Sequence, residues 1–424
     1  MTGLLDTISS ASGTFLLIAF LLYCVAFLLY VIAITGKRWG GTDPDTHRRR
    51  WGRVAFLVTV VAFAGHLLFF FTRWYAAKRI PTSNMYEFMT FLAMMIILAF
   101  LVIYALYRLP VVGAFAQPLT IVILAYASVF PKEITPLIPS LQSHWLKIHV
   151  TLAALGEAFF AVGFAAGLMY ILRTLDYGNR EKSSRREQHW TEVTLYVILI
   201  IIGFVTTVFS FQAGGYRAIF EVTVEANPDA GIEEPYTDYS EYVLPPIFAP
   251  HDAKLVEMTP FLGMERPLFE TPSWMKGRDA GRKWNTVIWS IMAGTLLYGI
   301  LRLIVRRPLG AIIKPVLSGL DPDDLDEISY RAIAIGFPIF TLGALIFAMI
   351  WAQEAWGRFW GWDPKEVWAL ITWLFYSVYL HLRLARTWQG KNSAWLSVIG
   401  FLIVMFTLIG VNLIIAGLHS YAGV

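Results

Sequence analysis

Apolar runs separated by short polar segments extend along most of the chain. Each run holds about 20 residues, enough for a helix to cross the hydrocarbon core of a bilayer. The runs lie at 13–35, 53–72, 86–106, 111–130, 146–172, 191–211, 286–305, 331–352, 366–385 and 395–417. The fourth run is marginal, but the pattern as a whole predicts an all-α polytopic membrane protein with about ten transmembrane helices.

The composition excludes a soluble enzyme. Of the 424 residues, 57% are apolar and 15% are charged, and the mean hydropathy is +0.58. The net charge of +4 does not indicate a nucleic-acid partner, because Lys and Arg gather in the cytoplasmic loops of polytopic proteins. We therefore expect the lipid bilayer as the surroundings and no nucleic acid.

Lys and Arg are distributed unevenly among the loops, and this predicts the orientation. They are most frequent in alternate loops, which the positive-inside rule places in the cytoplasm. These loops are 36–53, 105–110, 173–190, 302–331 and 383–391. Both chain ends and the long segment 212–285 then lie on the external face.

The segment 212–285 separates two groups of predicted helices, about six in 1–211 and about four in 286–424. It is acidic and rich in proline, and its stretch "IEEPYTDYSEY" has no apolar periodicity. Proline and polar residues in such density are typical of irregular structure. We expect an irregular external cap here.

Cysteine usage limits the chemistry that the chain can perform. Cys24 is its single cysteine and lies inside the first apolar run. An internal disulfide, a CxxC redox pair and a thiolate metal site are therefore excluded. Any metal or cofactor must be held by His or Met.

Half of the 16 tryptophans fall between Trp351 and Trp395. The densest part, "WAQEAWGRFWGWDPKEVWALITW", includes the external loop 351–366 between the eighth and ninth runs. Trp356 and Trp360 would share one face of a helical turn there. An interfacial belt is one interpretation, since Trp is enriched at headgroup depth. Three tryptophans within seven residues of a Gly-punctuated loop favour instead a planar, conjugated ligand stacked on Trp356, Trp360 and Trp362.

The "DPKE" sequence that follows also predicts a helix start. Asp363 would be the N-cap, Pro364 would take the first helical position, and Glu366 would complete a capping box. Direct contact of Asp363 and Glu366 with a ligand is the alternative. The two roles are compatible if the cap fixes the geometry of the loop.

Two histidines are candidates for iron ligands on the external face. His149 lies at the mouth of the fifth run, and His419 lies just past the end of the tenth. Two neutral imidazoles above and below a porphyrin would supply both axial ligands of its iron. Taken singly, each histidine is better explained as an interfacial polar residue, so the hypothesis depends on their combination with the Trp-rich loop.

Two further histidines lie within apolar runs. His381 is near the cytoplasmic end of the ninth run and His66 is in the second. Ionisable groups inside a membrane usually face a cavity or a partner, which makes both functional candidates. His381 is also explained as a helix-end residue beside Arg383 and Arg386, and the depths expected for His66 and His381 do not match.

The stretch "IWAQEAWGRFWGWDPKEVWALITWLFYSVYLHLR" resembles the "WWD" signature of haem-handling proteins of cytochrome c biogenesis. The resemblance is closest to the CcsA (ResC) family of the System II pathway. Supporting stretches are "HLLFFFTRWYAAKRIPTSNMYEFMTF", "WLKIHVTLAALGEAFFAVGFAAGLMYIL", "YRAIAIGFPIFTLGALIF" and "GVNLIIAGLHSYAG", so it extends from about residue 60 to the C-terminus. One departure is the segment 212–285, which is longer than the corresponding loop of that family.

The resemblance implies roles for individual residues. His149 and His419 would be the axial ligands of haem b on the external face, and His381 would hold haem at an inner site. His66 is a weaker candidate, because the second inner ligand of the family is generally assigned to a partner subunit. The loop residues that match the signature are Trp356, Trp360, Trp362, Asp363 and Glu366.

The implied function is cytochrome c maturation. Haem would move to the external face and be joined by thioether bonds to the CxxCH peptide of an apocytochrome c, as part of a holocytochrome c synthase (cytochrome c haem lyase) complex. A CcsB/ResB-type subunit would be the partner, with thiol-reduction proteins acting indirectly. The implied location is the bacterial inner membrane, or the thylakoid membrane of a plastid, and no catalytic residue is assigned.

Two alternatives remain open from the residues. The first is a haem exporter or chaperone without a role in ligation. The second is a quinone-linked redox protein of the cytochrome b type, although such proteins usually carry His pairs at comparable depths on facing helices.

Overall fold

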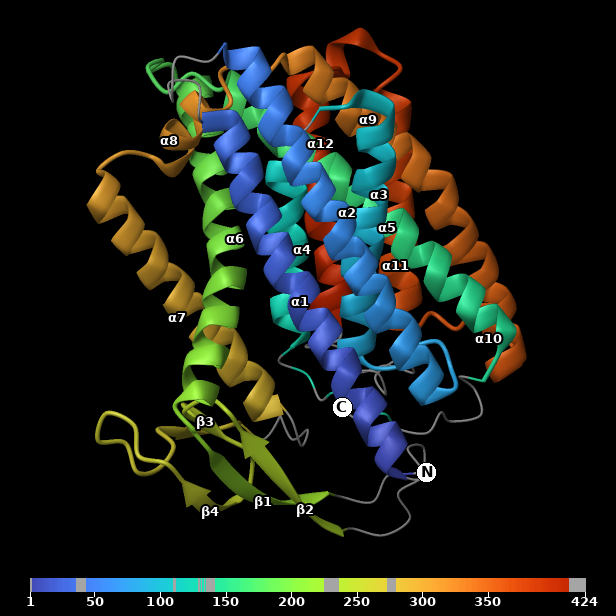
Figure 1. Ribbon diagram of the computed structural model, residues 1–424. Helices are drawn as coiled ribbons and strands as arrows, with labels where there is room; N and C mark the ends of the chain where they lie inside the picture. The colour runs from blue at the N-terminus through green and yellow to red at the C-terminus, as the bar shows by residue number, and fades with distance from the viewer. Residues whose placement is uncertain are drawn as a thin grey trace. The chain divides into compact units, whose positions relative to one another are not determined.

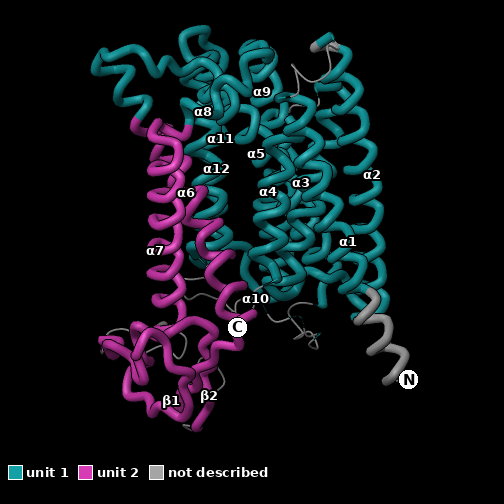
Figure 2. The backbone as a smooth tube through the Cα atoms, turned by 60° about the vertical axis from the view of Figure 1, so that its left-hand side comes forward, with its two compact units in different colours: residues 1–188, 310–424 teal, residues 189–309 magenta. Residues whose placement is uncertain are grey.

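The computed structural model describes residues 2–35, 43–109, 112–128, 130, 132, 134, 142–224, 236–272 and 280–411. The chain divides into two compact units, one of residues 1–188 with 310–424 and one of residues 189–309 (Figure 2). The first is a bundle of helices, and the second combines two helices with two small sheets (Figure 1). The site described below lies within the first unit.

Apart from α8 (Leu309–Val316), which lies in a predicted loop, the helices of the first unit follow the predicted apolar runs. They are α1 (Thr2–Thr35), α2 (Pro44–Ala77), α3 (Met85–Tyr107), α4 (Gly113–Ala127), α5 (His144–Thr174), α8 (Leu309–Val316), α9 (Pro322–Phe340), α10 (Ala348–Trp356), α11 (Pro364–Leu382) and α12 (Lys391–Met405). A short 3₁₀ turn, η5 (Arg386–Trp388), precedes α12. Side chains that accept backbone N–H bonds cap α2, α3, α5, α9 and α11, and these N-caps are Asp43, Asn84, Ser143, Asp321 and Asp363.

Helix α5 is the central element of this bundle and packs against α3, α4, α9, α10 and α12. Its glycines permit the close approach. A Cβ atom at Gly156 would lie 2.6 Å from Cβ of Phe340, and one at Gly163 would lie 2.7 Å from the side chain of Ile333. Small residues at helix interfaces let backbones approach within membranes. The middle of α5 is thereby held against α9.

Eight helices in the described part of the chain are long and apolar enough to cross a membrane. They are Ser12–Thr35, Thr46–Ala77, Met85–Tyr107, His144–Thr174, Lys182–Ala213, Gly281–Val305, Pro322–Trp356 and Lys391–Gly410. The all-α polytopic class is confirmed, but ten spans are more than this criterion supports. The fourth run forms α4, which has only 15 residues. The ninth forms α11, whose 19 residues include Lys365, Glu366 and several aromatic residues that lower its hydropathy.

Two π-helical segments interrupt the bundle near its Trp-rich end. Helix α9 continues through η4 (Thr341–Phe347) into α10, and α12 continues into η6 (Phe406–Gly410). Pro338 lies just before η4, and proline lacks the N–H that a regular α-helix would use. Wider turns of this kind occur frequently at functional sites.

The second unit contains most of α6 (Lys182–Ala213), the helix α7 (Ala280–Val305) and five strands. Strand β1 (Ala218–Val224) pairs antiparallel with β2 (Tyr236–Tyr242) and β4 (Lys254–Met258), and β3 (Phe248–Ala249) pairs parallel with β5 (Phe269–Glu270). Tyr216, Phe220 and Tyr242 belong to a small buried core. The prediction of an irregular segment missed this sheet, because proline and charged residues mask the short alternation in "AIFEVTV".

Candidate functional site

A pocket of about 210 Å³ lies in the first unit at the N-terminal half of α5. It is lined from α5, η4, α10, the Trp-rich loop, α11, η6 and the segment before α3. Aromatic and aliphatic side chains form most of the wall. Four of the predicted site residues line it together, namely His149, Trp356, Trp360 and Glu366.

His149 is held in one orientation by two contacts. Its Nδ1 lies 2.9 Å from the carbonyl oxygen of Gly343, and its ring is stacked on Trp351 with centroids 5.8 Å apart and an interplanar angle of 11°. A carbonyl oxygen only accepts, so Nδ1–H is the donor. In the neutral imidazole of this tautomer the lone pair lies on Nε2, a nitrogen through which histidine can bind a metal.

Gly343 brings the acceptor within reach of His149. A Cβ atom at this position would lie 2.3 Å from the backbone nitrogen of Ala153 and 2.6 Å from the carbonyl carbon of Leu152. Only a residue without a side chain lets η4 approach α5 this closely. The glycine and the wide π-helical turn therefore act together to position the imidazole.

The tryptophans of α10 and the following loop form one side of the pocket. Trp351 is 2% exposed and contacts Trp356, with ring centroids 4.8 Å apart. Trp356 and Trp360 also line the pocket. Within the described part of the chain, the buried Nε1–H of Trp360 has no hydrogen-bond acceptor. A buried donor of this kind favours a ligand that supplies an acceptor.

Trp362 takes a different position from the other two predicted tryptophans. Helix α10 ends at Trp356, and Gly357 caps it with φ of +70°, so Trp356 and Trp360 do not belong to one helical turn. Trp362 is 71% exposed, has φ of +57° and meets Trp360 edge-on. It lies at the surface of the loop and does not line the pocket.

The predicted capping box opens α11 and closes the loop. Asp363 is buried and caps the helix, while Oε2 of Glu366 accepts the backbone N–H groups of Asp363 and Gly361 at 3.1 and 2.8 Å. Glu366 also lines the pocket, whereas Asp363 does not. The cap thus fixes the geometry of the loop, as the sequence predicted.

The charged residues Glu157 and Lys365 also line the pocket. Glu157 follows His149 and Ala153 at intervals of four residues, so all three share one face of α5. It is 7% exposed, and within the described residues its Oε2 has no hydrogen-bond partner. Lys365 comes from the first turn of α11, and burial lowers the pKa of its ammonium to about 8.

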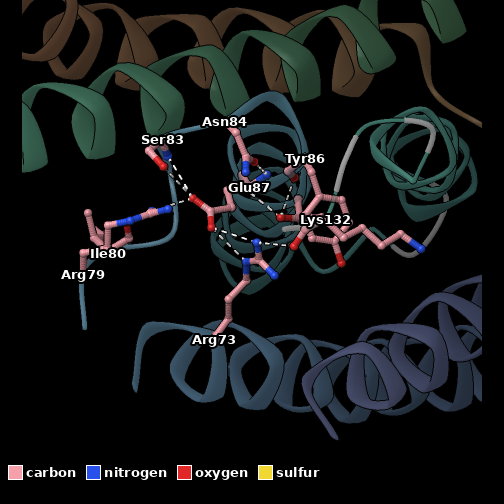
Figure 3. A network of polar contacts seen from close by, with 9 residues as sticks. Arg73, Arg79, Ile80, Ser83, Asn84, Tyr86, Glu87 and Lys132 are labelled. Carbon is pink, nitrogen blue, oxygen red and sulfur yellow. Dashed lines mark hydrogen bonds and ion pairs between the residues drawn. The ribbon is translucent and has the colours of Figure 1, made fainter. Parts of the chain in front are cut away.

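A buried polar cluster adjoins the pocket at the start of α3 (Figure 3). Glu87 is fully buried, and its carboxylate accepts bonds from Arg73 of α2 and from Arg79 at 2.7–3.0 Å. Ser83 donates its backbone N–H and its hydroxyl to Oε2 of Glu87, both at 3.0 Å. Arg79 and Ser83 line the pocket.

The remaining predicted histidines lie apart from this pocket. His381 is exposed in the last turn of α11, 15 residues and about 22 Å along the helix from Glu366. His66 is fully buried in α2, where its Nδ1 lies 3.4 Å from the hydroxyl of Tyr23. His419 lies outside the described residues.

The sequence reasoning missed several residues of the pocket. Glu157 had a visible signal, because it is an ionisable residue within an apolar run, eight positions after His149. Arg79 and Lys147 had none, because both lie in polar segments next to helices, where basic residues are common. Only the folded chain brings them to the pocket.

Comparison with known proteins gives the family. The chain matches the model of the family described as "Cytochrome C assembly protein" over residues 82–219 and 287–419. It is 31% identical over 353 residues to cytochrome c biogenesis protein CcsA of Gloeothece citriformis, covering 82% of this chain and 81% of that protein. The CcsA proteins of Pyropia yezoensis (28% identical; 94% and 93% covered) and Gloeobacter violaceus (29%; 95% and 94%) are similar over nearly their whole length. The chain therefore belongs to the cytochrome c assembly protein family, as a multi-pass membrane protein with a role in cytochrome c maturation.

Proposed function

We propose that the pocket binds haem b with His149 as one axial ligand and presents it on the external face for attachment to apocytochrome c. The observation that carries this proposal is the hydrogen bond from Nδ1 of His149 to Gly343, which leaves the metal-binding lone pair on Nε2. The aromatic wall formed by Trp351, Trp356 and Trp360 suits a flat conjugated ring. The donor set is therefore compatible with haem.

The size of the pocket bears on how a porphyrin would lie. Its volume of about 210 Å³ is below the roughly 300–1,000 Å³ that is usual for small-molecule sites. A haem would therefore extend beyond this cavity, with an edge outside it. An accessible edge is what attachment to a polypeptide requires, and Trp362, exposed at the loop surface, is available to contact it.

The second axial ligand in this proposal is His419. It lies eight residues after Val411, the last described residue of the segment that follows η6. Thr407 and Leu408 of η6 already line the pocket. The last described turn before His419 therefore contributes to the wall of this pocket.

Attachment to apocytochrome c adds two cysteine thiols of a CxxCH peptide across the haem vinyl groups. Each addition forms one C–S bond and moves one proton from sulfur to carbon. The pocket contributes positioning: His149 and the tryptophans hold the ring and exclude water from its face. Reduced iron suits this step, because oxidised iron would favour thiol oxidation.

Two partners complete the proposal. Apocytochrome c would approach from the external face. A CcsB/ResB-type membrane subunit would supply a second ligand beside His381 for haem held at an inner site. The exposure of His381 on the surface of the first unit supports this role, because a ligand shared between subunits must be reachable from outside its own helix bundle.

Absorption spectroscopy of the purified full-length protein tests the outer site. We expect haem bound to the wild type with the spectrum of two imidazole ligands, and loss of that spectrum in His149→Ala. The matched control is His144→Ala, because His144 begins the same helix, is exposed and does not line the pocket. A His149→Ala protein that keeps the wild-type spectrum would refute the assignment. Co-expression with the partner and an apocytochrome, scored for covalent haem, separates ligation from export alone.

A further inference from the structure

The cluster of Arg73, Glu87 and Arg79 holds a guanidinium group rigidly at the edge of the pocket. Two arginines and one carboxylate give it a formal charge of +1, although Arg73 and Arg79 are only 3% and 9% exposed. Glu87 is fixed in turn, because Ser83 donates two hydrogen bonds to it and Asn84 caps the helix on its backbone N–H. Nη1 of Arg79 lies 2.7 Å from the carboxylate so fixed.

The two arginines differ in where they point. Arg73 runs from α2 to Glu87 and to the carbonyl oxygen of Lys132, and it does not line the pocket (Figure 3). Arg79 donates to Glu87 from the other side and lines the pocket. Lys147 also lines the pocket. The buried cationic cluster therefore meets the ligand site through Arg79.

The pocket shows a second sign of an oxygen-bearing ligand. Trp360 lines the same cavity, and within the described residues its buried Nε1–H has no acceptor. A guanidinium group and an indole N–H are both donors, and both are complementary to a carboxylate. The family model matches the chain from residue 82 onward, so Arg79 lies just outside the matched segment.

We propose that Arg79 anchors a carboxylate of the ligand held in this pocket, with Glu87 as the residue that positions its guanidinium. The proposal rests on the proposed function, in which the ligand is haem and the carboxylates are its propionate side chains. The planar arginine fork forms short, charge-assisted bonds to carboxylates. This contact would fix the rotation of the ring about its axis, and with it the direction in which the vinyl groups point.

The test compares haem b with its dimethyl ester, in which both carboxylates are blocked, for binding to the full-length protein in detergent. The wild type should bind haem b at least about tenfold more tightly than the ester. Arg79→Gln should bind both within about twofold, and Arg79→Lys should keep part of the preference. Arg73→Gln is the matched control, because it removes the other arginine from Glu87 without changing the pocket wall, and it should keep more of the preference than Arg79→Gln does.

The outcomes separate this inference from the function on which it rests. A wild type that binds neither haem nor ester refutes the proposed function. A wild type that binds both equally, or an Arg79→Gln protein that retains the preference, refutes only the role of Arg79. If Arg79→Gln and Arg73→Gln lose the preference for haem b equally, the cluster supports the fold of the pocket and Arg79 does not contact the ligand. If Arg79 binds an anionic lipid instead, the wild type should bind haem b and its dimethyl ester with equal affinity.

Discussion

His149 and His381 are both predicted iron ligands, but their surroundings differ. His149 is half-buried, donates to a backbone carbonyl and stacks on a buried tryptophan, in a pocket built from several helices. His381 is exposed at the far end of α11. Ligand sites need side chains held by second contacts, and only the first has them within this unit. The comparison supports the proposal that the outer site is formed by this chain alone, with His419 as its second ligand, and that the inner site needs a ligand from another subunit.

The largest expected effect tests that difference directly. The protein purified alone should carry haem at the outer site only, whereas co-purification with its CcsB/ResB-type partner should add a second haem. His381→Ala should abolish the second haem and leave the first unchanged, while His149→Ala should do the reverse. Haem per polypeptide, measured by pyridine haemochrome assay, distinguishes the cases. A full second haem in the protein without any partner would contradict the comparison.

A smaller effect is expected when the support of His149 is altered. Gly343→Ala places a Cβ atom against backbone atoms of Leu152 and Ala153, which cannot move aside as a side-chain end could. We expect a loss of about 2 kcal/mol in stability from overpacking. Displacement of the Gly343 carbonyl should weaken haem binding roughly 10- to 100-fold, as loss of an outer-shell hydrogen bond does at metal sites.

The control for this substitution is Gly299→Ala in α7. A Cβ atom there meets nothing within 4 Å, and alanine favours a helix more than glycine does. This variant should be neutral or slightly stabilised and should keep its haem. Thermal unfolding together with haem titration reports both quantities. Unchanged haem affinity in a folded Gly343→Ala protein would mean that the carbonyl does not orient His149.

The sequence predicted part of the pocket wall, for physical reasons that differ by residue. The cap formed by Asp363 and Glu366 is local, so a four-residue pattern predicts it. The position of His149 beside Trp351 depends on packing between α5 and α10, which periodicity along one chain does not encode. The contribution of Arg79 depends on a carboxylate at Glu87 and on the turn between α2 and α3. Such long-range contacts are visible only in the folded molecule.

The smallest effect separates the two sites by pH. Burial penalises the ammonium of Lys365 and lowers its pKa to about 8, so this charge is present below pH 8 and is lost as pH rises through that value. Because Lys365 lines the outer pocket, a carboxylate-bearing ligand there should bind about fivefold more weakly at pH 9 than at pH 7. His381 lies at the opposite end of α11, so haem bound there with the partner should not follow this change. Lys365→Met provides the control, since it should bind less tightly at pH 7 and show no decline to pH 9. Titrations at both pH values measure the difference, and a wild-type decline that persists in Lys365→Met would assign it to another group.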